Sequence, residues 1–330
     1  MIKAAVIGGS GYIGGELIRL LAMHPEVEIS AVTSRRFAGK KVHKVHPNLR
    51  GLDLRFRSDY DFDADVIFLA VPHGTSMKII DEFLGSAKII DMSADFRLRR
   101  ELYREYYGEH AKPELIGEFV YGLPELHRDE IKKAELVANP GCNATATILA
   151  LYPFRGLTER AIVDLKVSSS AGGRRENVAS IHSERSHVVR VYRPFHHRHE
   201  GEVIQETGIR AMFTVHSVDM VRGILATAYF EYDGSQKELL KRLLIYKNEH
   251  FIRLVTDRGG LQRFPDPKYV LGSNFVDIGF AYDEVNGRAI ILSAIDNLIK
   301  GGSGQAVQNM NLMFGLDERT GLDYYPVYPV

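Results

Sequence analysis

A single cysteine stands where a helix is expected to begin. Cys142 is the only cysteine among the 330 residues and lies in the run Asn139-Pro-Gly-Cys-Asn-Ala-Thr145. The free N–H groups and the dipole at a helix N-terminus lower the pKa of a thiol and favour the nucleophilic thiolate. The same N–H groups can hold an oxyanion that forms when a carbonyl is attacked. We therefore predict that Cys142 is a catalytic nucleophile, with a buried structural cysteine as the alternative.

The segment 174–199 could bind an anion. It holds six arginines, no lysine and only two acidic residues, whereas the whole chain carries 42 basic and 42 acidic residues. Arginine favours planar, bidentate recognition of carboxylate or phosphate groups. Arg174, Arg190 and Arg193 are therefore predicted to bind substrate.

The same segment concentrates histidines. It contains five of the 13 histidines, three of them in His196-His-Arg-His-Glu200. His197 or His199 could supply acid/base chemistry beside Cys142, and the sequence ranks neither. In an extended segment these two side chains would point the same way. Zinc binding and a solvated histidine cluster are the alternatives; no second cysteine or His-Glu-x-x-His pattern completes a zinc site, so no metal is predicted.

Glycines occur where a first strand should turn into a first helix. Gly9-x-Gly11-x-x-Gly14 matches the dinucleotide fingerprint, which lets the backbone approach a pyrophosphate at a helix N-terminus. A glycine-rich structural turn is the alternative. The residues predicted to bind the dinucleotide here are Gly8, Ser10, Gly11, Tyr12, Ile13 and Gly14.

The end of the second predicted strand indicates which dinucleotide binds. NAD sites normally offer Asp or Glu there, but this chain offers Thr33-Ser-Arg-Arg36. A hydroxyl and two guanidinium groups suit a 2′-phosphate. We predict NADP(H), held by Ser34, Arg35 and Arg36, with a solvated basic loop as the alternative.

Two domains are expected from the pattern of elements. In the first 140 residues, short apolar runs alternate with amphipathic segments, which is typical of an α/β Rossmann-type fold with a parallel sheet. The second half has long β-branched runs with few helices between them, which indicates an α+β domain. The predicted strands are 4–7, 27–32, 66–71, 88–92 and 136–138, then 162–168, 213–218, 224–232, 275–282 and 289–294, with a weaker one at 52–57 and a terminal helix at 304–314.

Composition narrows the class of protein. The formal net charge is zero, so no overall basic field predicts binding to nucleic acid or an anionic membrane. One cysteine excludes an intramolecular disulfide, and neither a signal peptide nor a run of about 18 apolar residues is seen. A reducing cytoplasm is the predicted location.

The combination of a dinucleotide domain, a thiol, a histidine and clustered arginines predicts thiol-based reduction of an acyl phosphate to an aldehyde. The rival Tyr-x-x-x-Lys dehydrogenases are excluded because none of the 16 tyrosines has lysine four residues later. A non-catalytic NADP-binding regulator is the alternative of a different class.

The chain resembles the N-acetyl-γ-glutamyl-phosphate reductase family. The motifs that carry the resemblance run in order along nearly the whole chain: Gly8-Gly-Ser-Gly-Tyr-Ile-Gly-Gly-Glu-Leu17, Ser93-Ala-Asp-Phe-Arg-Leu98, Tyr121-Gly-Leu-Pro-Glu125, Asn139-Pro-Gly-Cys142, His197-Arg-His199 and Asp296-Asn-Leu-Ile-Lys-Gly301. The resemblance implies a fold like that of aspartate-semialdehyde and glyceraldehyde-phosphate dehydrogenases, NADPH as reductant, and a thioester on Cys142.

The resemblance also implies roles for other segments. His73, in the loop Val71-Pro-His-Gly74, and Asn297 would contact the cofactor, and the helix after Gly301 would pack on the first domain. The expected domains are residues 1–141 with 301–330 for NADP binding, and 142–300 for catalysis and dimerisation. A homodimer or homotetramer is expected.

One departure from the family concerns the substrate. The enzyme for the acetylated substrate usually shows His-Arg-His-Thr-Pro-Glu, whereas this chain reads His197-Arg-His-Glu-Gly-Glu202. This version resembles the branch that reduces 2-aminoadipate 6-phosphate or glutamate 5-phosphate attached to a small acidic amino-group carrier protein, in lysine or arginine biosynthesis. Clustered arginines would suit an acidic partner. The acetylated substrate remains the alternative.

Overall fold

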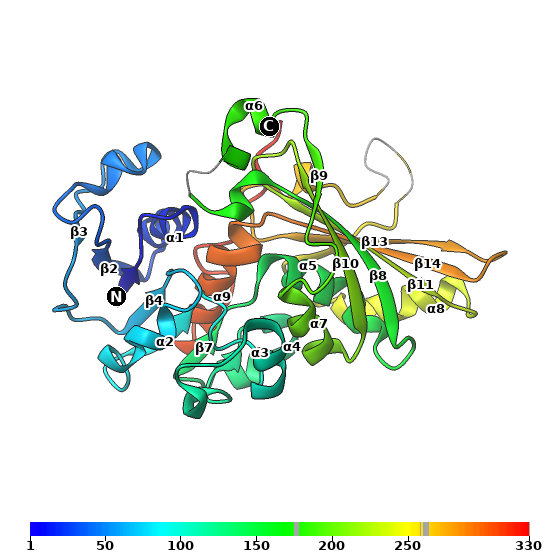
Figure 1. Cartoon of the computed structure of the whole chain (residues 1–330), viewed down its shortest axis with the longest axis horizontal. Helices are drawn as coiled ribbons and strands as arrows, with labels where there is room; N and C mark the ends of the chain where they lie inside the picture. The colour runs from blue at the N-terminus through cyan, green and yellow to red at the C-terminus, as the bar shows by residue number, and fades with distance from the viewer. Residues whose placement is uncertain (175–177, 258, 260–263, 330) are drawn as a thin grey trace. The chain divides into compact units, whose positions relative to one another are not determined.

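The computed structural model describes residues 1–174, 178–257, 259 and 264–329 (Figure 1). The chain divides into two compact units. The first comprises residues 1–104, 108–140 and 302–323, and the second comprises residues 105–107, 141–301 and 324–330. The chain therefore changes unit between Pro140 and Gly141, directly before Cys142, and again between Gly301 and Gly302, each one residue from an expected boundary.

The first unit is built on a parallel sheet with strand order β3-β2-β1-β4-β5-β7-β6. β4 is buried throughout, as are the last four residues of β1, because helices cover both faces of such a sheet. The order reverses between β1 and β4, and ligands of such sheets bind beyond the carboxyl ends of the strands at this reversal. The strands are β1 (Ile2–Ile7), β2 (Val27–Thr33), β3 (Phe56–Arg57), β4 (Val66–Leu69), β5 (Lys88–Asp91), β6 (Val120–Tyr121) and β7 (Leu136–Ala138).

The helices of the first unit include the predicted terminal helix. α9 contacts α1, α4 and β5, so its expected packing on the first domain is confirmed. The helices are α1 (Tyr12–Met23), α2 (Ser76–Ile79), α3 (Arg100–Tyr107, whose last three residues count with the second unit), α4 (Pro124–Ile131) and α9 (Gly304–Met313).

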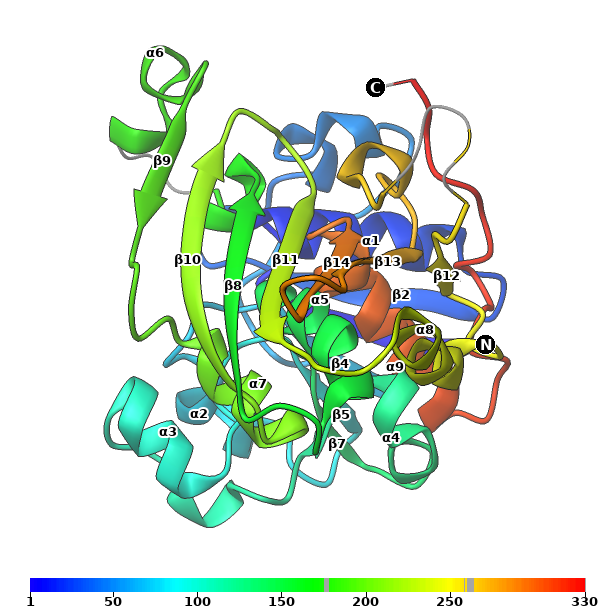
Figure 2. The same ribbon diagram turned by 90° about the vertical axis from the view of Figure 1, so that its right-hand side faces the viewer.

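The second unit is built on a mixed sheet with strand order β12-β13-β14-β11-β8-β10-β9. Figure 2 shows β9, β10, β8 and β11 side by side. α5 packs against β11 and β14, and α7 packs against β10, while alternate residues on the opposite face of β8 stay exposed or half-buried. The strands are β8 (Arg160–Val167), β9 (Val189–Tyr192), β10 (Arg210–Val218), β11 (Ile224–Glu231), β12 (Ile252–Leu254), β13 (Val276–Asp283) and β14 (Arg288–Ile295); the helices are α5 (Cys142–Leu151), α6 (His182–Arg185), α7 (His199–Thr207) and α8 (Gln236–Leu243).

The predicted fold class is confirmed, and each predicted strand is present, although the weaker one shortens to Phe56–Arg57. The segment through His199 is not extended, because α7 begins there, so the case in which His197 and His199 would point the same way does not apply. Acidic residues in the first turn favour this helix, and Gly208 closes it in the left-handed region, with φ at 73°.

The C-terminal tail also differs from the expectation, which placed it in the first domain. From Tyr324 onwards it belongs to the second unit. The Val327 N–H donates to the Leu271 carbonyl over 3.0 Å, and the ring of Tyr328 lies 5.6 Å from that of Tyr269. These contacts hold a tail of tyrosines, prolines and valines whose position the sequence pattern did not indicate.

Candidate active site

Cys142 is the first residue of α5, as predicted, and follows the N-cap Gly141. The Thr145 N–H donates to the Gly141 carbonyl over 2.8 Å and closes the first turn of the helix. The Cys142 side chain is half-buried, and its Sγ lies 3.9 Å from Asn143 Oδ1. The thiol therefore combines a helix N-terminus with partial exposure, which a nucleophile requires and a sealed structural cysteine lacks.

Glu202 is a residue of this site that the sequence analysis missed. Its side chain is fully buried on α7, and its Oε2 accepts the Gly141 N–H over 2.9 Å. The N–H that precedes Cys142 is therefore held by a carboxylate and is not offered to an oxyanion. The spacing His199-x-x-Glu202 on one helix was the available signal, because residues three apart share a helix face.

His199 lies against the backbone next to the thiol. A Cβ added to Gly141 would stand 2.5 Å from His199 Nε2, so only glycine lets the ring come this close. Nε2 is 4.0 Å from Glu202 Oε1. The structure thus brings Cys142, His199 and Glu202 together within the second unit.

His197 packs behind His199. The two rings are perpendicular, with centroids 4.8 Å apart, and His197 also lies 5.7 Å from Phe213. Burial, followed by the charges of His199, Arg198 and Arg193, lowers the pKa of His197 to about 2. Its Nδ1 accepts the His199 N–H over 3.2 Å. His197 is therefore a neutral ring that supports the segment, and the structure separates two histidines that the sequence left equal.

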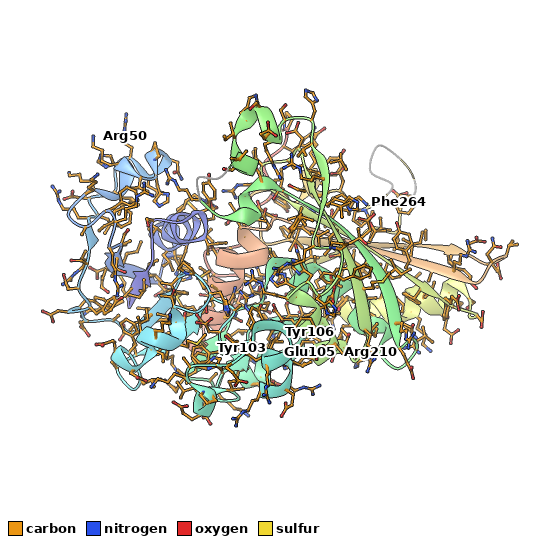
Figure 3. The ribbon with its side chains drawn as sticks, in the orientation of Figure 1. Arg50, Tyr103, Glu105, Tyr106, Arg210 and Phe264 are labelled. Carbon is orange, nitrogen blue, oxygen red and sulfur yellow. The ribbon has the colours of Figure 1, made fainter. Side chains whose placement is uncertain are left out.

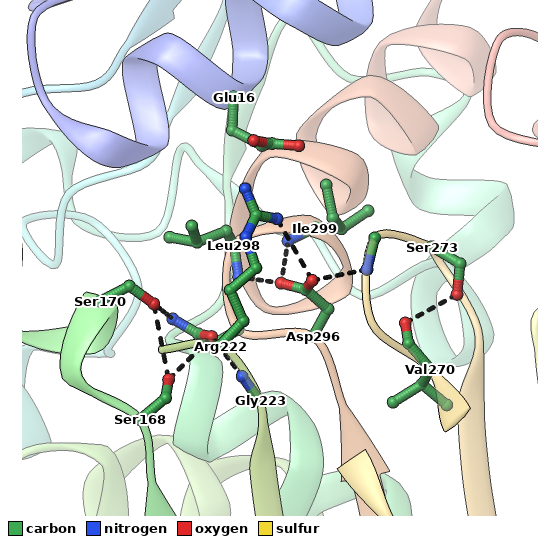
Figure 4. Close-up of polar contacts among 12 residues, drawn as sticks. Glu16, Ser168, Ser170, Arg222, Gly223, Val270, Ser273, Asp296, Leu298 and Ile299 are labelled. Carbon is green, nitrogen blue, oxygen red and sulfur yellow. Dashed lines mark hydrogen bonds and ion pairs between the residues drawn. The ribbon is translucent and has the colours of Figure 1, made fainter. Parts of the chain in front are cut away.

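A second backbone segment approaches Cys142 at Gly301. A Cβ added to Gly301 would lie 2.7 Å from Cys142 Cβ. The buried carboxylate of Asp296 organises this segment, as Figure 4 shows: it accepts the N–H groups of Leu298 and Ile299, at 2.8 and 3.2 Å, and the Gly272 N–H at 2.8 Å. The motif Asp296-Asn-Leu-Ile-Lys-Gly301 therefore fixes the backbone at the point where Gly301 contacts Cys142.

Asn297 is buried in the second unit. Its Oδ1 accepts from Ser168 Oγ and the Gly223 N–H, at 3.0 and 2.8 Å, and its Nδ2 donates to Ser170 Oγ over 2.9 Å (Figure 4). These bonds tie the loop after β8 to the start of β11. A contact of Asn297 with the cofactor stays a prediction.

The predicted substrate arginines occupy the exposed segment around α6 and β9. Arg190 lies on β9 and donates to the Glu184 carbonyl over 3.1 Å, while Arg193 follows β9 in the left-handed region, with φ at 47°. Arg174 is exposed, and Arg175 and Glu176, which contributed to the charge pattern, lie outside the described residues. The structure keeps Arg190 and Arg193 exposed, as anion binding requires.

Tyr192 is a second residue that the sequence analysis did not select. It pairs directly with the buried Val215 of β10, so its ring lies on the helix-covered face of the sheet. Burial of the hydroxyl, followed by the charge of Cys142, raises the pKa of Tyr192 to about 12, although the whole residue is 39% exposed. The hydroxyl is thus a neutral hydrogen-bond donor at physiological pH.

The glycine-rich turn of the first unit fits a dinucleotide. Gly8 has φ of +87°, and a Cβ on Gly14 would lie 2.7 Å from Gly9 Cα, so the turn needs these glycines for its own packing. A Cβ on Gly11, by contrast, would meet no described atom within 4 Å. Gly11 is the N-cap of α1, so its open side lies at a helix N-terminus that suits a pyrophosphate.

The other predicted dinucleotide residues surround this turn. Tyr12 is exposed, and the Ile13 carbonyl accepts from Ser303 Oγ over 2.9 Å. Ser34 Oγ donates to Ser10 Oγ over 3.0 Å, which joins the end of β2 to the turn. Arg35 and Arg36 follow and are exposed, so two cations are available to a 2′-phosphate, whereas Ser34 itself is buried.

His73 lies in the loop after β4. Its Nδ1 is 2.7 Å from Oδ1 of the buried Asp95, which follows β5. Its ring lies 6.2 Å from that of Tyr103, a residue of α3 labelled in Figure 3. His73 therefore stands at the carboxyl edge of the parallel sheet, with its orientation fixed by neighbours.

Two absences hold for the described part of the chain. No three side chains of His, Cys, Asp or Glu gather there as a possible metal site. Within the same residues, no helix has the length and apolar character needed to cross a bilayer.

Comparison with known proteins places this geometry in a family. A model of the semialdehyde dehydrogenase NAD-binding domain matches residues 3–134, and a model of the semialdehyde dehydrogenase dimerisation domain matches residues 142–297. Proteins named [LysW]-L-2-aminoadipate/[LysW]-L-glutamate phosphate reductase are 84% identical in Thermococcus kodakarensis, 79% in Pyrococcus furiosus and 48% in Cenarchaeum symbiosum, each over all of both chains. The chain belongs to this family of phosphate reductases. Membership confirms the predicted enzyme class, an oxidoreductase with a nicotinamide dinucleotide cofactor.

Solved structures agree on the fold. Aspartate semialdehyde dehydrogenase II from Vibrio cholerae, complexed with ASA, superposes with a TM-score of 0.71 at 16% identity and covers 98% of this chain and 99% of its own. The enzyme from Candida albicans, solved with NADP, has a TM-score of 0.68 at 15% identity and covers 95% and 98%. The expected likeness to semialdehyde dehydrogenases is therefore confirmed at the level of fold.

Two glycine variants test whether the turn holds the dinucleotide. Gly14→Ala should lower the free energy of unfolding by about 2 kcal/mol, since the new methyl group collides with backbone. Gly11→Ala should change it by less than about 0.5 kcal/mol. It should nevertheless weaken NADPH binding about tenfold, because its methyl group occupies the open approach. Denaturant unfolding and titration of nicotinamide fluorescence measure the two effects, and unchanged affinity in Gly11→Ala would contradict the assignment.

Proposed function

We propose that this chain reduces an acyl phosphate to a semialdehyde with NADPH, through a thioester on Cys142. The substrate is 2-aminoadipate 6-phosphate, glutamate 5-phosphate or both, linked to an amino-group carrier protein, as the names of the full-length relatives suggest. The observation that carries the proposal is the half-buried thiol at the start of α5, beside His199 and Glu202. The relatives favour this substrate over the acetylated one, and the location proposed is the cytoplasm.

The proposed reaction has three steps: formation of a thioester, hydride transfer and release of the semialdehyde. The Cys142 thiolate attacks the acyl carbon, and the bond to phosphate breaks, so that phosphate leaves and a thioester forms. When bound, NADPH supplies a hydride to this carbon. Collapse of the resulting thiohemiacetal returns the thiolate and releases the semialdehyde, and one proton is consumed overall by the released phosphate.

His199 is the proposed acid/base residue. It lies against Gly141, whereas His197 is buried and has a pKa of about 2, so that His197 stays neutral throughout the working pH range. Glu202 supports His199 from the next turn of the same helix and holds the Gly141 N–H. The alternative of a regulator without catalysis gives no reason for a buried carboxylate to brace a helix that begins with a thiol.

The thioester route is tested with Cys142→Ser. The variant should bind NADPH normally but lose more than about a thousandfold in semialdehyde formation, since a serine hydroxyl is a far weaker nucleophile at neutral pH. Without NADPH, the wild-type protein should release phosphate in a burst and gain the mass of the acyl group. Turnover by the serine variant, or by protein fully alkylated with iodoacetamide, would exclude a thioester on this residue.

Arg190 and Arg193 are proposed to dock the acidic carrier protein. Both are exposed and flank Tyr192, whose ring lies on the same sheet face as the helices that carry the thiol and His199. Exposed arginines steer an acidic partner and fix its register more than they add to affinity. The carrier would thereby deliver its acyl group to the second unit, which holds Cys142.

The docking proposal predicts a selective effect. Arg190→Ala and Arg193→Ala should each raise KM for the carrier-linked substrate about tenfold, with an effect that shrinks in high salt. KM for a small free semialdehyde in the reverse reaction should change less than about twofold. Arg50→Ala, an exposed arginine of the first unit labelled in Figure 3, is the charge-matched control. Equal effects on both substrates would argue against docking.

A homodimer through the open face of the second unit's sheet is also proposed, with a homotetramer as the larger alternative. Met212, Ile162, Tyr229, Ile290 and Ala281 stand opposite one another on five neighbouring strands and form one apolar row. Ile162 is 51% exposed, and the family model that covers these strands is described as a dimerisation domain. A second copy, related by a two-fold axis, would cover the same row from the other side.

Ile162→Glu tests this interface. A carboxylate in the centre of the row should separate the copies, because a charge buried without a partner costs several kcal/mol. Light scattering after gel filtration should then report half the mass of the wild-type dimer. Val285→Glu is the control, since Val285 is 93% exposed at the turn between β13 and β14. A mass that Ile162→Glu leaves unchanged would place the interface elsewhere.

A further inference from the structure

His46 is a buried histidine of the first unit that the sequence analysis did not select. It lies between two short helical turns, Val42–Lys44 and Pro47–Leu49, in the connection from β2 to β3. Only 7% of the residue is exposed. A Cβ added to Gly15 of α1 would collide with the His46 ring. The ring therefore packs directly against the N-terminal part of the helix that follows the glycine-rich turn.

The same ring holds the glycine-rich turn through a hydrogen bond. His46 Nε2 lies 2.8 Å from the Gly9 carbonyl oxygen. Because a carbonyl oxygen can only accept, Nε2 must carry the proton of this bond. The Gly9 N–H donates in turn to the Thr33 carbonyl over 2.9 Å. Both backbone groups of Gly9 are thus held, one by the end of β2 and the other by His46.

The bond to Gly9 also sets the direction of the next N–H group. The peptide bond between Gly9 and Ser10 is trans, so its C=O and N–H point to opposite sides. Since the carbonyl faces His46, the Ser10 N–H points away from the buried ring. Within the described part of the chain, no acceptor pairs with the N–H groups of Ser10 or of residues 11–13. This row of N–H groups suits the charge of a pyrophosphate.

Without His46, little would fix the peptide that follows Gly9. Glycine adopts positive and negative φ about equally readily, so this peptide could rotate. Rotation would turn the carbonyl oxygen, in place of the Ser10 N–H, toward the open side of the turn. The partial negative charge of that oxygen would repel a phosphate group. The histidine therefore preorganises the turn for an anion, which reduces the cost of binding.

We propose that His46 is a positioning residue for the dinucleotide: by holding the Gly9 carbonyl, it keeps the Ser10 N–H directed toward the pyrophosphate. This inference rests on the proposed function, because it concerns the NADPH that the reductase uses. It assigns a part in cofactor binding to the connection between β2 and β3, which lies outside the glycine motif. The adenosine 2′-phosphate, which Arg35 and Arg36 are predicted to hold, does not depend on this bond.

The test compares two ligands and measures their binding to the full-length protein without turnover. NADPH carries the pyrophosphate, whereas adenosine 2′-monophosphate keeps the adenine, the ribose and the 2′-phosphate but lacks it. His46→Leu removes the donor and keeps an apolar side chain in the same space. It should weaken NADPH binding about tenfold and leave adenosine 2′-monophosphate within about twofold, as measured by calorimetry. A merely structural disturbance would weaken both ligands alike.

Two further variants separate the hydrogen bond from the packing. His46→Gln offers an amide N–H to the Gly9 carbonyl and should keep NADPH affinity within about threefold of the wild type. Gly15→Ala should displace the ring and reproduce the selective loss, since its methyl group collides with His46. The double variant Gly15→Ala/His46→Leu should bind NADPH no more weakly than the weaker single variant. His43→Leu, at a half-buried histidine of the same connection, is the matched control and should leave both affinities unchanged.

Four results would overturn the inference: equal weakening of both ligands by His46→Leu, no weakening of NADPH, an equally large loss in His46→Gln, or additive losses in the double variant. If His46→Leu does not fold, retained affinity in His46→Gln together with a selective loss in Gly15→Ala supports the inference, and any other pairing contradicts it. Wild-type protein that binds no NADPH would instead contradict the proposed function. The two proposals therefore fail separately.

Discussion

The hydrogen bond from the Gly141 N–H to the buried carboxylate of Glu202 is the contact on which the thiol site depends. It joins the start of α5 to α7, two helices that also pack on one another. Because Gly141 has no side chain, the bond can form with His199 pressed against the same backbone. The Glu202 carboxylate thus fixes the backbone at the start of α5 and lies beside His199 on α7.

Three buried carboxylates have the same function at different places. Glu202 accepts the N–H before Cys142, Asp95 accepts the N–H groups of Gly74 and of Met77 in the first turn of α2, and Asp296 accepts those that lead toward Gly301. Hydrogen bonds to an ionised acceptor are stronger than hydrogen bonds between neutral groups. A buried carboxylate without its N–H donors would be unfavourable, because nothing would replace the water that it lost on burial. Irregular segments, which have no ladder of their own, gain a fixed shape in this way.

The sequence was sufficient for the parts that depend on local pattern. Apolar runs located most strands of both sheets but missed the short strands β6, β9 and β12, and the position of Cys142 located the start of α5. It failed where partners lie far apart along the chain: Glu202 is 61 residues from Gly141, and no local spacing links the two. It also did not show that a helix begins at His199, because a helix of nine residues gives a weak periodic signal when its first turn is polar.

Burial separates residues that composition treats alike. His197 and His199 differ by two positions, yet one ring is enclosed against Phe213 and neutral, while the other faces Gly141. Arginines of one segment divide in the same way, since Arg185 spans the ends of β8 and β10 through the Val167 and Val218 carbonyls, whereas Arg190 and Arg193 stay exposed. A cluster of one residue type in the sequence therefore contains both side chains that stabilise the fold around a site and side chains that remain accessible to a ligand. The division follows from which side chains the sheet and helices enclose.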